Sequence, residues 1–337
     1  MLAAMLGVVS SLSKLRLIST LFALSLPVFL VSRHLLRIQR RVKQVPRTYE
    51  RVLILGGSSG IGRALAHEYA ARGARVCITA RREEELRKVV EECNALPIVP
   101  NSKDEARIFS VVTDFTNVED MVHLRTAVED EWQGVDTLII CAGVSALRPL
   151  MEVAGLERDG RIFTPSQATL EGIQKTVDIA DKAAKVNYMG PLISAVTFIP
   201  LLQRSSLAPS VLLISTMAAL VPAPTRSLYA STKAASLLLF QALAIEHPLI
   251  RFSFAIPATV KGNFRASAVD GGIPREYDPN EIGITPKDVA RRCARAIDAG
   301  EKYVFMPYLY SKFGHWAYWL APTFVEWRAG LKYHFAA

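Results

Sequence analysis

The sequence is poor in cysteine and has no cluster of metal-binding residues. Its 337 residues include four widely spaced cysteines, Cys77, Cys93, Cys141 and Cys293, with neither a CxxC pair nor a Cys/His cluster at zinc-binding spacing. We therefore expect no metal site, and we interpret the four cysteines as free thiols in a reducing compartment.

Internal repeats and low-complexity linkers are also absent, and a composition that is 50% hydrophobic excludes a disordered chain. The length allows one large core or two modest ones. The net charge of +9 raises the question of a nucleic-acid partner. No RNA-binding motif and no interleaved aromatic residues accompany the basic residues, so we expect no nucleic-acid binding.

The first 32 residues are far more apolar than the rest. Their uncharged run, Leu17 to Ser32, has 16 residues and contains Pro27, which would kink a helix. The run is short of the roughly 20 residues that span a bilayer. We expect residues 1–32 to be a membrane anchor that either spans the bilayer or dips into it. A signal peptide is disfavoured because the basic residues follow the apolar run.

A basic segment follows the apolar one and carries most of the net charge. Basic residues next to an apolar segment favour the cytosolic side and attract anionic lipids. We expect residues 33–50 to be a juxtamembrane linker and the rest of the chain to be cytosolic, with the endoplasmic reticulum as the expected membrane. The basic residues are Arg33, Arg37, Arg40, Arg41, Lys43 and Arg47.

From Arg51 onward, short apolar runs alternate with amphipathic stretches. The alternation predicts a doubly wound, seven-stranded parallel sheet with helices on both faces, over residues 51–307. Thr285, Pro286 and Asp288 form a helix start with an N-cap. The predicted strands are 51–55, 75–80, 107–113, 136–142, 210–216, 251–257 and 303–307. The predicted helices are 61–72, 84–93, 117–132, 170–202, 228–245 and 286–299.

Two segments fall outside this alternation. Residues 144–170 form an irregular connection of a length that is typical of functional loops. The tail, residues 308–337, contains three of the four tryptophans. It is either a helix that packs on the domain or in a homodimer contact, or an interfacial segment whose rings lie among lipid headgroups.

A glycine-rich turn follows the first predicted strand. Gly56, Gly60 and Gly62 allow close approach of a pyrophosphate to the backbone at a helix N-terminus. At the end of the second strand, Arg81 and Arg82 occupy the place where an NAD-binding domain has an acid. Guanidinium groups suit a 2'-phosphate, so we predict NADP(H) as the cofactor.

A tyrosine and a lysine lie four residues apart in "SLYASTK". On a helix this spacing puts Tyr229 and Lys233 on one face, where the ammonium would lower the pKa of the phenol. The hydroxyls of Ser215 and Thr216 lie at the end of the fifth predicted strand, and ligands of open parallel sheets bind at such strand ends. We therefore predict one catalytic cleft.

These motifs resemble those of the short-chain dehydrogenase/reductase family over residues 51–307. The matching stretches are "GGSSGIG", "CAG", "VNYMG", "ISTMAA" and "YASTK". The apolar N-terminus, "NYMGPL" and the aromatic tail look like the membrane-bound, 11-beta-hydroxysteroid-dehydrogenase-like branch of that family.

The resemblance implies a Rossmann domain that catalyses NAD(P)-dependent oxidation or reduction of an alcohol/carbonyl pair. It implies that Tyr229 donates a proton to the carbonyl oxygen, that Lys233 holds the nicotinamide ribose, and that Asn187 organises a proton-relay water. It also implies that Thr216 supplies the catalytic hydroxyl, with Ser215 as the fallback. The implied cofactor-binding residues are Gly56, Ser58, Ser59, Gly60, Ile61, Gly62, Arg81, Arg82, Asp114, Asn187, Tyr229, Lys233 and Val260. Ser58 and one of the two arginines would take the 2'-phosphate, and Asp114 the adenine.

Some residues depart from the family pattern. Thr216 replaces the usual serine, and Ile140 and Cys141 replace two asparagines. Ala258 and Gly262 replace a glycine and a threonine, and the connection between Gly143 and Asn187 is about 20 residues longer than usual. These departures indicate an unusual substrate pocket or a weak enzyme.

The leading hypothesis is a membrane-bound NADP(H)-dependent oxidoreductase that acts on a lipophilic ketone or secondary alcohol in lipid metabolism. Candidate substrates are a steroid, a ketosphingoid base or an acyl glycerone phosphate. A tethered reductase of soluble carbonyls is an alternative within the enzyme class. The alternative outside it is an NADP(H)-binding scaffold or redox sensor at a membrane.

Overall fold

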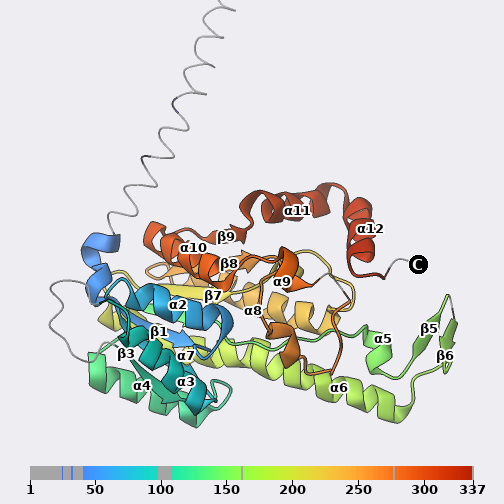
Figure 1. The fold of residues 1–337 in the computed structure, drawn as a ribbon, viewed down its shortest axis with the longest axis horizontal. Helices are drawn as coiled ribbons and strands as arrows, with labels where there is room; N and C mark the ends of the chain where they lie inside the picture. Colours follow the sequence, from blue (N-terminus) through green and yellow to red (C-terminus); the bar gives the residue numbers. More distant parts are fainter. Residues whose placement is uncertain are drawn as a thin grey trace, which may run out of the picture.

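The computed structural model describes residues 25, 32, 41–97, 108–160, 162–275 and 278–335. Within them, seven parallel strands form a sheet in the order β3-β2-β1-β4-β7-β8-β9 (Figure 1). The predicted strands are confirmed, with ends that differ by at most two residues. The strands are β1 (Arg51–Leu55), β2 (Arg75–Ala80), β3 (Ile108–Val112), β4 (Thr137–Ile140), β7 (Ser210–Ile214), β8 (Arg251–Pro257) and β9 (Tyr303–Met306).

Helices cover both faces of this sheet. Alternate residues of β1 belong to different cores: Val52 and Ile54 pack on one face, and Leu53 and Leu55 on the other. The first face is covered by α2 (Gly60–Ala70), α3 (Glu83–Asn94) and α10 (Pro286–Ala299). The second is covered by α4 (Val118–Trp132), α7 (Gly190–Ser205) and α8 (Ser227–Glu246). The predicted doubly wound sheet is therefore confirmed.

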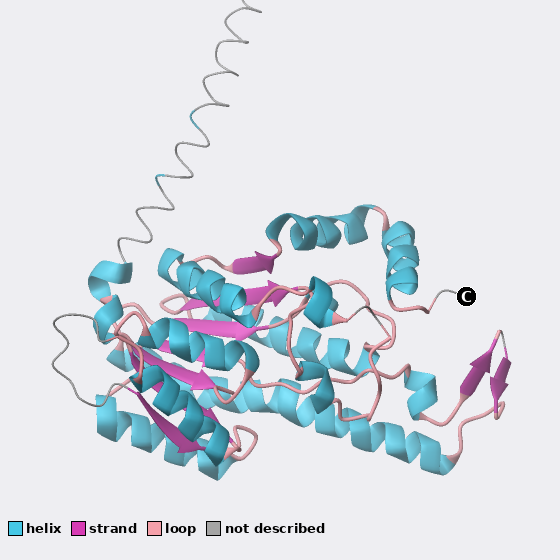
Figure 2. Ribbon diagram, viewed as in Figure 1, coloured by secondary structure: helices cyan, strands magenta, loops and turns pink. Residues whose placement is uncertain are grey.

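The chain order of the strands reverses between β1 and β4, and ligands of such sheets bind beyond the carboxyl ends of the strands at this point. Figure 2 shows the arrowheads of the sheet pointing towards the side of the molecule where the long connection lies. That connection contains α5 (Leu150–Val153) and an antiparallel pair, β5 (Glu157–Asp159) with β6 (Ile162–Thr164). Further short helical elements lie in the connections between the longer elements. They are η1 (Arg47–Tyr49), η3 (Met217–Ala219), η4 (Phe264–Ser267) and α9 (Pro279–Ile282).

The helix predicted over 170–202 is confirmed as part of one helical stretch, Leu170–Ser205, but its middle is not regular α-helix. It divides into α6 (Leu170–Ala184), a π-helical turn η2 (Lys185–Met189) and α7. In η2, Asn187 is completely buried and bonds to Val144 in the loop after β4. This long-range contact favours the wider turn, and π-helical turns often mark functional sites.

Two helical stretches among the described residues are long and apolar enough to cross a membrane by length and composition, Leu170–Ser205 and Ser227–Glu246. Core helices of soluble domains pass the same test. Both stretches pack on the sheet, so we interpret them as helices of the domain.

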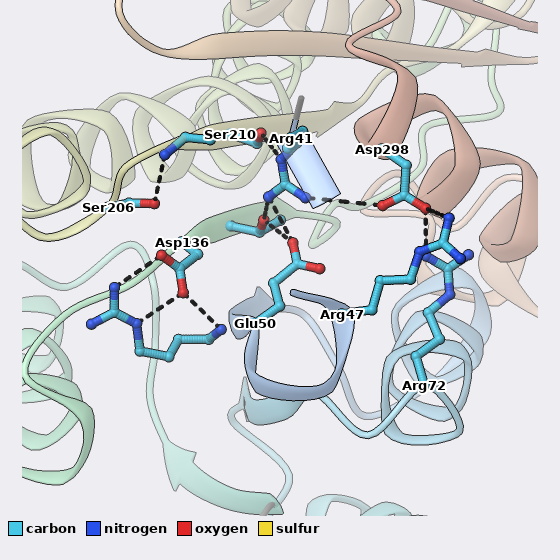
Figure 3. Close-up of polar contacts among 11 residues, drawn as sticks. Arg41, Arg47, Glu50, Arg72, Asp136, Ser206, Ser210 and Asp298 are labelled. Atoms are coloured by element: carbon cyan, nitrogen blue, oxygen red, sulfur yellow. Dashed lines mark hydrogen bonds and ion pairs between the residues drawn. The ribbon is translucent and has the colours of Figure 1, made fainter. Parts of the chain in front are cut away.

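The predicted anchor, residues 1–32, lies outside the described residues except for Ser25 and Ser32, and so does the linker before Arg41. The described part of the linker corrects the expectation of a lipid-facing segment. Arg41 is completely buried, and its guanidinium donates to Glu50 and Thr137, both at 2.7 Å (Figure 3). Arg47 pairs with Asp298 at 2.8 Å. These partners lie at the amino ends of the strands and on α10, so the domain begins before Arg51.

The tail forms two helices, α11 (Tyr308–Leu320) and α12 (Pro322–Lys332), which follow β9 (Figure 1). Ten of their large apolar side chains are exposed. These are Tyr308, Leu309, Tyr310, Phe313, Trp316, Trp319, Leu320, Phe324, Trp327 and Leu331.

Candidate active site

The glycine-rich turn forms a tight connection between β1 and α2. Gly56 has φ +94°, and a Cβ there would lie 2.6 Å from the backbone nitrogen of Ala142. A Cβ on Gly62 would lie 2.0 Å from the carbonyl oxygen of Gly56. Only glycine fits these two places, and α2 begins at Gly60 with its free N–H groups beside the turn. The turn therefore has the form of a pyrophosphate-binding loop, with Ile61 in the first turn of the helix.

Arg82 joins the loop after β2 to this turn. Its Nη2 donates to the hydroxyl of Ser58 at 2.9 Å and to that of Ser59 at 3.0 Å. A guanidinium and two hydroxyls thus converge at one point, which is a donor set suited to a phosphate. The sequence left the choice between Arg81 and Arg82 open, and the structure brings Arg82 to the turn.

Asp114 follows β3, and the positive charge of Arg81 is one of the influences that lower the pKa of its carboxyl. Although partial burial opposes ionisation, the pKa of the Asp114 carboxyl is lowered because the backbone N–H and hydroxyl of Thr116 donate to it. An ionised carboxylate is the form that accepts hydrogen bonds from an amino group such as that of adenine. The residues of this half of the site therefore fit an adenine dinucleotide.

The predicted catalytic side chains do come together at the carboxyl end of β7. Tyr229 is 8% exposed, and its side chain hydrogen-bonds to Thr216, which follows this strand. The hydroxyl of Thr216 also accepts from the backbone N–H of Ala218 at 3.3 Å, which fixes it. Phe264 of η4 packs edge-on against the Tyr229 ring, with the two ring centroids 5.9 Å apart. The phenol thus lies between a hydroxyl and an aromatic wall.

The fallback hydroxyl, Ser215, makes no hydrogen bond to another described residue. Its Oγ is buried and has no hydrogen-bond partner among the described residues, while its backbone N–H donates to Ala255. We therefore assign the role of the strand-end hydroxyl to Thr216.

Burial raises the pKa of Tyr229, and this effect exceeds the lowering by the Arg226 charge, the Thr216 hydrogen bond and the Arg265 charge. The predicted lowering by Lys233 is therefore wrong in this structure. The Lys233 ammonium instead donates to the carbonyl oxygen of Ile214, the last residue of β7, at 2.7 Å. Burial lowers the pKa of Lys233 to about 8.

Cys141, which replaces an asparagine of the family pattern, lies in the same region. The charge of Lys233 and a hydrogen bond with the backbone of Gly62 both lower the pKa of its thiol, so Cys141 lies between α8 and the glycine-rich turn. Burial raises the pKa of Cys141 to about 12. The thiol is therefore neutral, and like the other three cysteines it is free.

Asn187 holds the loop after β4 in place. Its Oδ1 accepts from the backbone N–H of Val144 at 2.9 Å, and its Nδ2 donates to the Val144 carbonyl at 3.0 Å and to Thr232 at 3.1 Å. Asn187 thereby connects this loop to the catalytic helix α8.

The loop after β8 carries the remaining departures from the family pattern. Val260 bridges to Ile284, which fixes the first part of the loop. Gly262 has φ +118°, a conformation that a threonine rarely adopts, and its N–H donates to Asn280 at 3.0 Å. Glycine at this position is therefore required by the backbone of this chain.

The sequence reasoning did not single out Arg226, although it lies three residues before Tyr229 and so on the same helix face. Its guanidinium carbon lies 5.2 Å from the centroid of the Tyr229 ring. Its Nη1 donates to the completely buried Ser145 at 2.8 Å.

Comparisons with known proteins show what this chain is similar to. A family model described as short chain dehydrogenase matches residues 50–271. A relative from Sesamum indicum, 11-beta-hydroxysteroid dehydrogenase A, is 27% identical over 291 residues, which are 84% of this chain and 75% of the relative. Dehydrogenase/reductase SDR family member 7B of Xenopus tropicalis is 25% identical over 277 residues, which are 81% of this chain and 82% of the relative.

A solved structure has the same fold. It is an alcohol dehydrogenase from the archaeon Thermococcus sibiricus complexed with 5-hydroxy-NADP, with a TM-score of 0.58 and 22% identity. The match covers 76% of this chain and 94% of that chain.

Proposed function

The chain belongs to the short-chain dehydrogenase/reductase family, and we propose that it is a membrane-bound, NADP(H)-dependent enzyme that reduces a ketone or oxidises a secondary alcohol on a lipophilic substrate. Oxidoreductase activity on CH–OH groups follows from the family, and the relatives confirm the resemblance to the 11-beta-hydroxysteroid-dehydrogenase-like branch. The observation that carries the proposal is the contact of Tyr229 with Thr216, on the helix that also bears Lys233, at the carboxyl edge of the sheet.

The family binds NAD(P)(H), and the choice of NADP(H) is supported by the contacts of Arg82 with Ser58 and Ser59. These groups would hold the 2'-phosphate, and Asp114 the adenine. The glycine-rich turn and the N–H groups of α2 would hold the pyrophosphate. The alcohol dehydrogenase structure from Thermococcus sibiricus holds an NADP derivative, which is consistent with this choice.

The bound dinucleotide would supply a hydride to the carbonyl carbon. Thr216 and Tyr229 would both hydrogen-bond to the carbonyl oxygen, and Tyr229 would donate its proton to the oxygen as negative charge develops there. Because burial raises the pKa of Tyr229, the phenol is protonated at neutral pH, which is the form required of a general acid in reduction. Lys233 would hold the ribose and carry a positive charge below pH 8. Asn187 would fix the loop that borders the substrate.

The exposed face of α11 and α12 supports a membrane location. Ten exposed large apolar side chains, three of them tryptophans, exceed what a solvent-facing helix pair normally carries. Lys312, Arg328 and Lys332 stand among them with one acid, Glu326, which suits a surface of anionic lipid. A lipophilic substrate such as a steroid, a ketosphingoid base or an acyl glycerone phosphate would partition into that membrane.

A homodimer is a further part of the proposal. Val196 on α7 and Leu238 and Ile245 on α8 are exposed apolar side chains on neighbouring helices of the second face. Light scattering of detergent-solubilised protein measures this directly.

Tryptophan quenching by brominated phospholipid tests the membrane contact of the tail. Trp316, Trp319 and Trp327 are exposed, whereas Trp132 is buried in the sheet domain and serves as the internal control. We expect quenching of the full chain in vesicles and its loss when the three tail tryptophans are replaced by phenylalanine. Equal emission with and without brominated lipid would instead indicate that the tail packs against protein.

The enzymatic proposal is tested by NADPH consumption with panels of steroid ketones, ketosphingoid bases and acyl glycerone phosphates. Wild type should consume NADPH with one panel, and Tyr229→Phe should not, while both bind NADPH with equal affinity. Equal affinity without turnover on any panel would favour the alternative of an NADP(H)-binding scaffold or redox sensor.

A further inference from the structure

We propose that Arg226 is a positioning residue that stabilises the phenolate form of Tyr229, a role that the family pattern gives to a lysine. The inference rests on the proposed function only where it concerns turnover. Its electrostatic part stands on the geometry of the site.

The guanidinium is held over the ring of Tyr229. Arg226 precedes α8 and lies three residues before Tyr229, so the two side chains share one helix face. The 5.2 Å between the guanidinium carbon and the ring centroid is within the range of a cation–π contact. Arg226 is 7% exposed, which limits screening by solvent.

The hydrogen bond to Ser145 fixes this arrangement. Ser145 lies in the loop after β4 and is completely buried, and its carbonyl oxygen accepts from Val269 at 2.9 Å. The loop after β4 and the loop after β8 therefore both support the arginine. A planar guanidinium can donate to Ser145 and lie against a ring at the same time, which a lysine ammonium cannot do equally well.

Among the described residues, other groups also act on the phenol or lie close to it in the chain. On α8, the Lys233 ammonium donates to the carbonyl of Ile214, which directs it towards the sheet. From η4, the positive charge of Arg265 has a smaller effect, and Thr216, which follows β7, contributes a hydrogen bond. The acid that follows η4, Asp270, accepts from the backbone N–H groups of Leu147 and Arg148, at 2.6 and 2.8 Å.

The role of Arg226 follows from the proton balance of the reduction. The O–H bond of Tyr229 breaks, an O–H bond forms on the product alcohol, and the hydride from the nicotinamide forms the new C–H bond. Tyr229 is left as a phenolate until water returns a proton. A cation fixed over the ring stabilises this phenolate more than the neutral phenol. In the oxidation direction, the same cation favours the phenolate as general base.

Fluorine NMR measures the effect without any substrate. A 3-fluorotyrosine placed at position 229 titrates at lower pH than tyrosine and gives one resonance, although the chain has ten tyrosines. In Arg226→Gln its pKa should rise by about 1 to 2 units, as expected for loss of a charge at this separation in a partly buried site. Arg226→Lys should raise it by less than about 0.5 units because the charge remains.

Two further variants keep the proposal falsifiable if Arg226→Gln does not fold. Ser145→Ala removes one hydrogen bond that holds the guanidinium and should raise the pKa of the fluorotyrosine by a smaller amount. Arg265→Gln should raise it less than Arg226→Gln does. An unchanged pKa in Arg226→Gln, or in Ser145→Ala where the glutamine variant is unfolded, would overturn the proposal.

The pH dependence of turnover separates this inference from the proposed function. If wild type turns over a substrate, the limb of the kcat/KM profile that reports Tyr229 should move to higher pH in Arg226→Gln and stay in Arg226→Lys. A limb that does not move would contradict a role in catalysis. A shifted fluorotyrosine pKa in a chain that turns over no substrate would support the electrostatic role and contradict the proposed function.

Discussion

Nη2 of Arg82 donates to the hydroxyl of Ser58 at 2.9 Å, so a single guanidinium connects the end of β2 with the turn between β1 and α2. The same nitrogen donates to Ser59 at 3.0 Å. The three groups lie on the part of the sheet where the adenosine end of a dinucleotide binds in this fold. The contribution of this contact to cofactor preference can be measured by replacing Arg82 alone.

Replacing Arg82 should change the cofactor preference. In Arg82→Ala the affinity for NADPH should fall by about tenfold or more, because a charge-assisted contact with the 2'-phosphate is lost, while the affinity for NADH stays within about twofold. Cofactor fluorescence titrations measure both constants. Arg81→Ala is the matched control and should weaken NADPH binding less. Equal losses of affinity for NADPH and NADH in Arg82→Ala would contradict the assignment of Arg82 to the 2'-phosphate.

The strand-end hydroxyl should be Thr216 and not Ser215. Thr216→Val keeps the shape of the side chain but removes the hydroxyl that contacts Tyr229, so kcat should fall by roughly 10². Ser215→Ala removes a hydroxyl that lacks a hydrogen-bond partner among the described residues, so kcat should fall less than about threefold. The reverse order in steady-state kinetics would transfer the role to Ser215.

Lys233 should reduce the stability of the folded chain at neutral pH. Its pKa is lowered by burial to about 8 from an ordinary value of 10.5, so at pH 7 the folded chain contains a buried charge. Lys233→Met should therefore raise the free energy of unfolding by about 1 to 3 kcal/mol at pH 7, while abolishing turnover.

The pH dependence of that difference has a defined sign. Between about pH 8 and 10.5 the lysine is deprotonated in the folded chain and protonated in the unfolded one, so the wild type gains stability as pH rises. The advantage of Lys233→Met should shrink by about 2 kcal/mol between pH 7 and 9.5. Denaturant titrations at the two values measure it, and a constant or growing advantage would show that the lysine is not neutralised by burial.

The buried pair of Arg41 and Glu50 should stabilise the attachment of the N-terminal segment to the domain. Arg41→Met leaves Glu50 buried without its partner and should cost about 3 to 5 kcal/mol. Arg41→Met with Glu50→Gln should recover part of that loss, and Lys43→Met, at an exposed position, should cost little. Denaturant unfolding of residues 1–337 measures all three. A cost below about 1 kcal/mol for Arg41→Met would contradict a structural role for the pair.

The strands and most helices were predictable from the sequence because their signals are local. The uninterrupted apolar run of β7 predicts a strand buried on both faces, and Thr285 with Asp288 predicts the start of α10, where the Thr285 hydroxyl accepts from the Asp288 N–H at 3.1 Å. Tyr229 and Thr216 could also be paired in advance, since strand-end residues of an open parallel sheet share one edge.

The predictions that failed depend on contacts between distant parts of the chain. Arg41 lies in a run of basic residues that looks solvated or lipid-facing, but its partner Thr137 is 96 residues away. The π-helical turn at Asn187 was not predicted, because Asn187 contacts Val144, 43 residues before it. The direction of the Lys233 ammonium towards Ile214 depends on the path of β7, which helical spacing does not report.

The most direct test of the account is label transfer in membranes. Membranes that contain wild type or Tyr229→Phe are supplied with NADPH deuterated at the transferred position, and their lipids are scanned for molecules that gain one deuterium. We expect a labelled alcohol with wild type and none with Tyr229→Phe, although both bind NADPH. Binding of NADPH with no labelled lipid from wild type, or equal labelling with Tyr229→Phe, would contradict it.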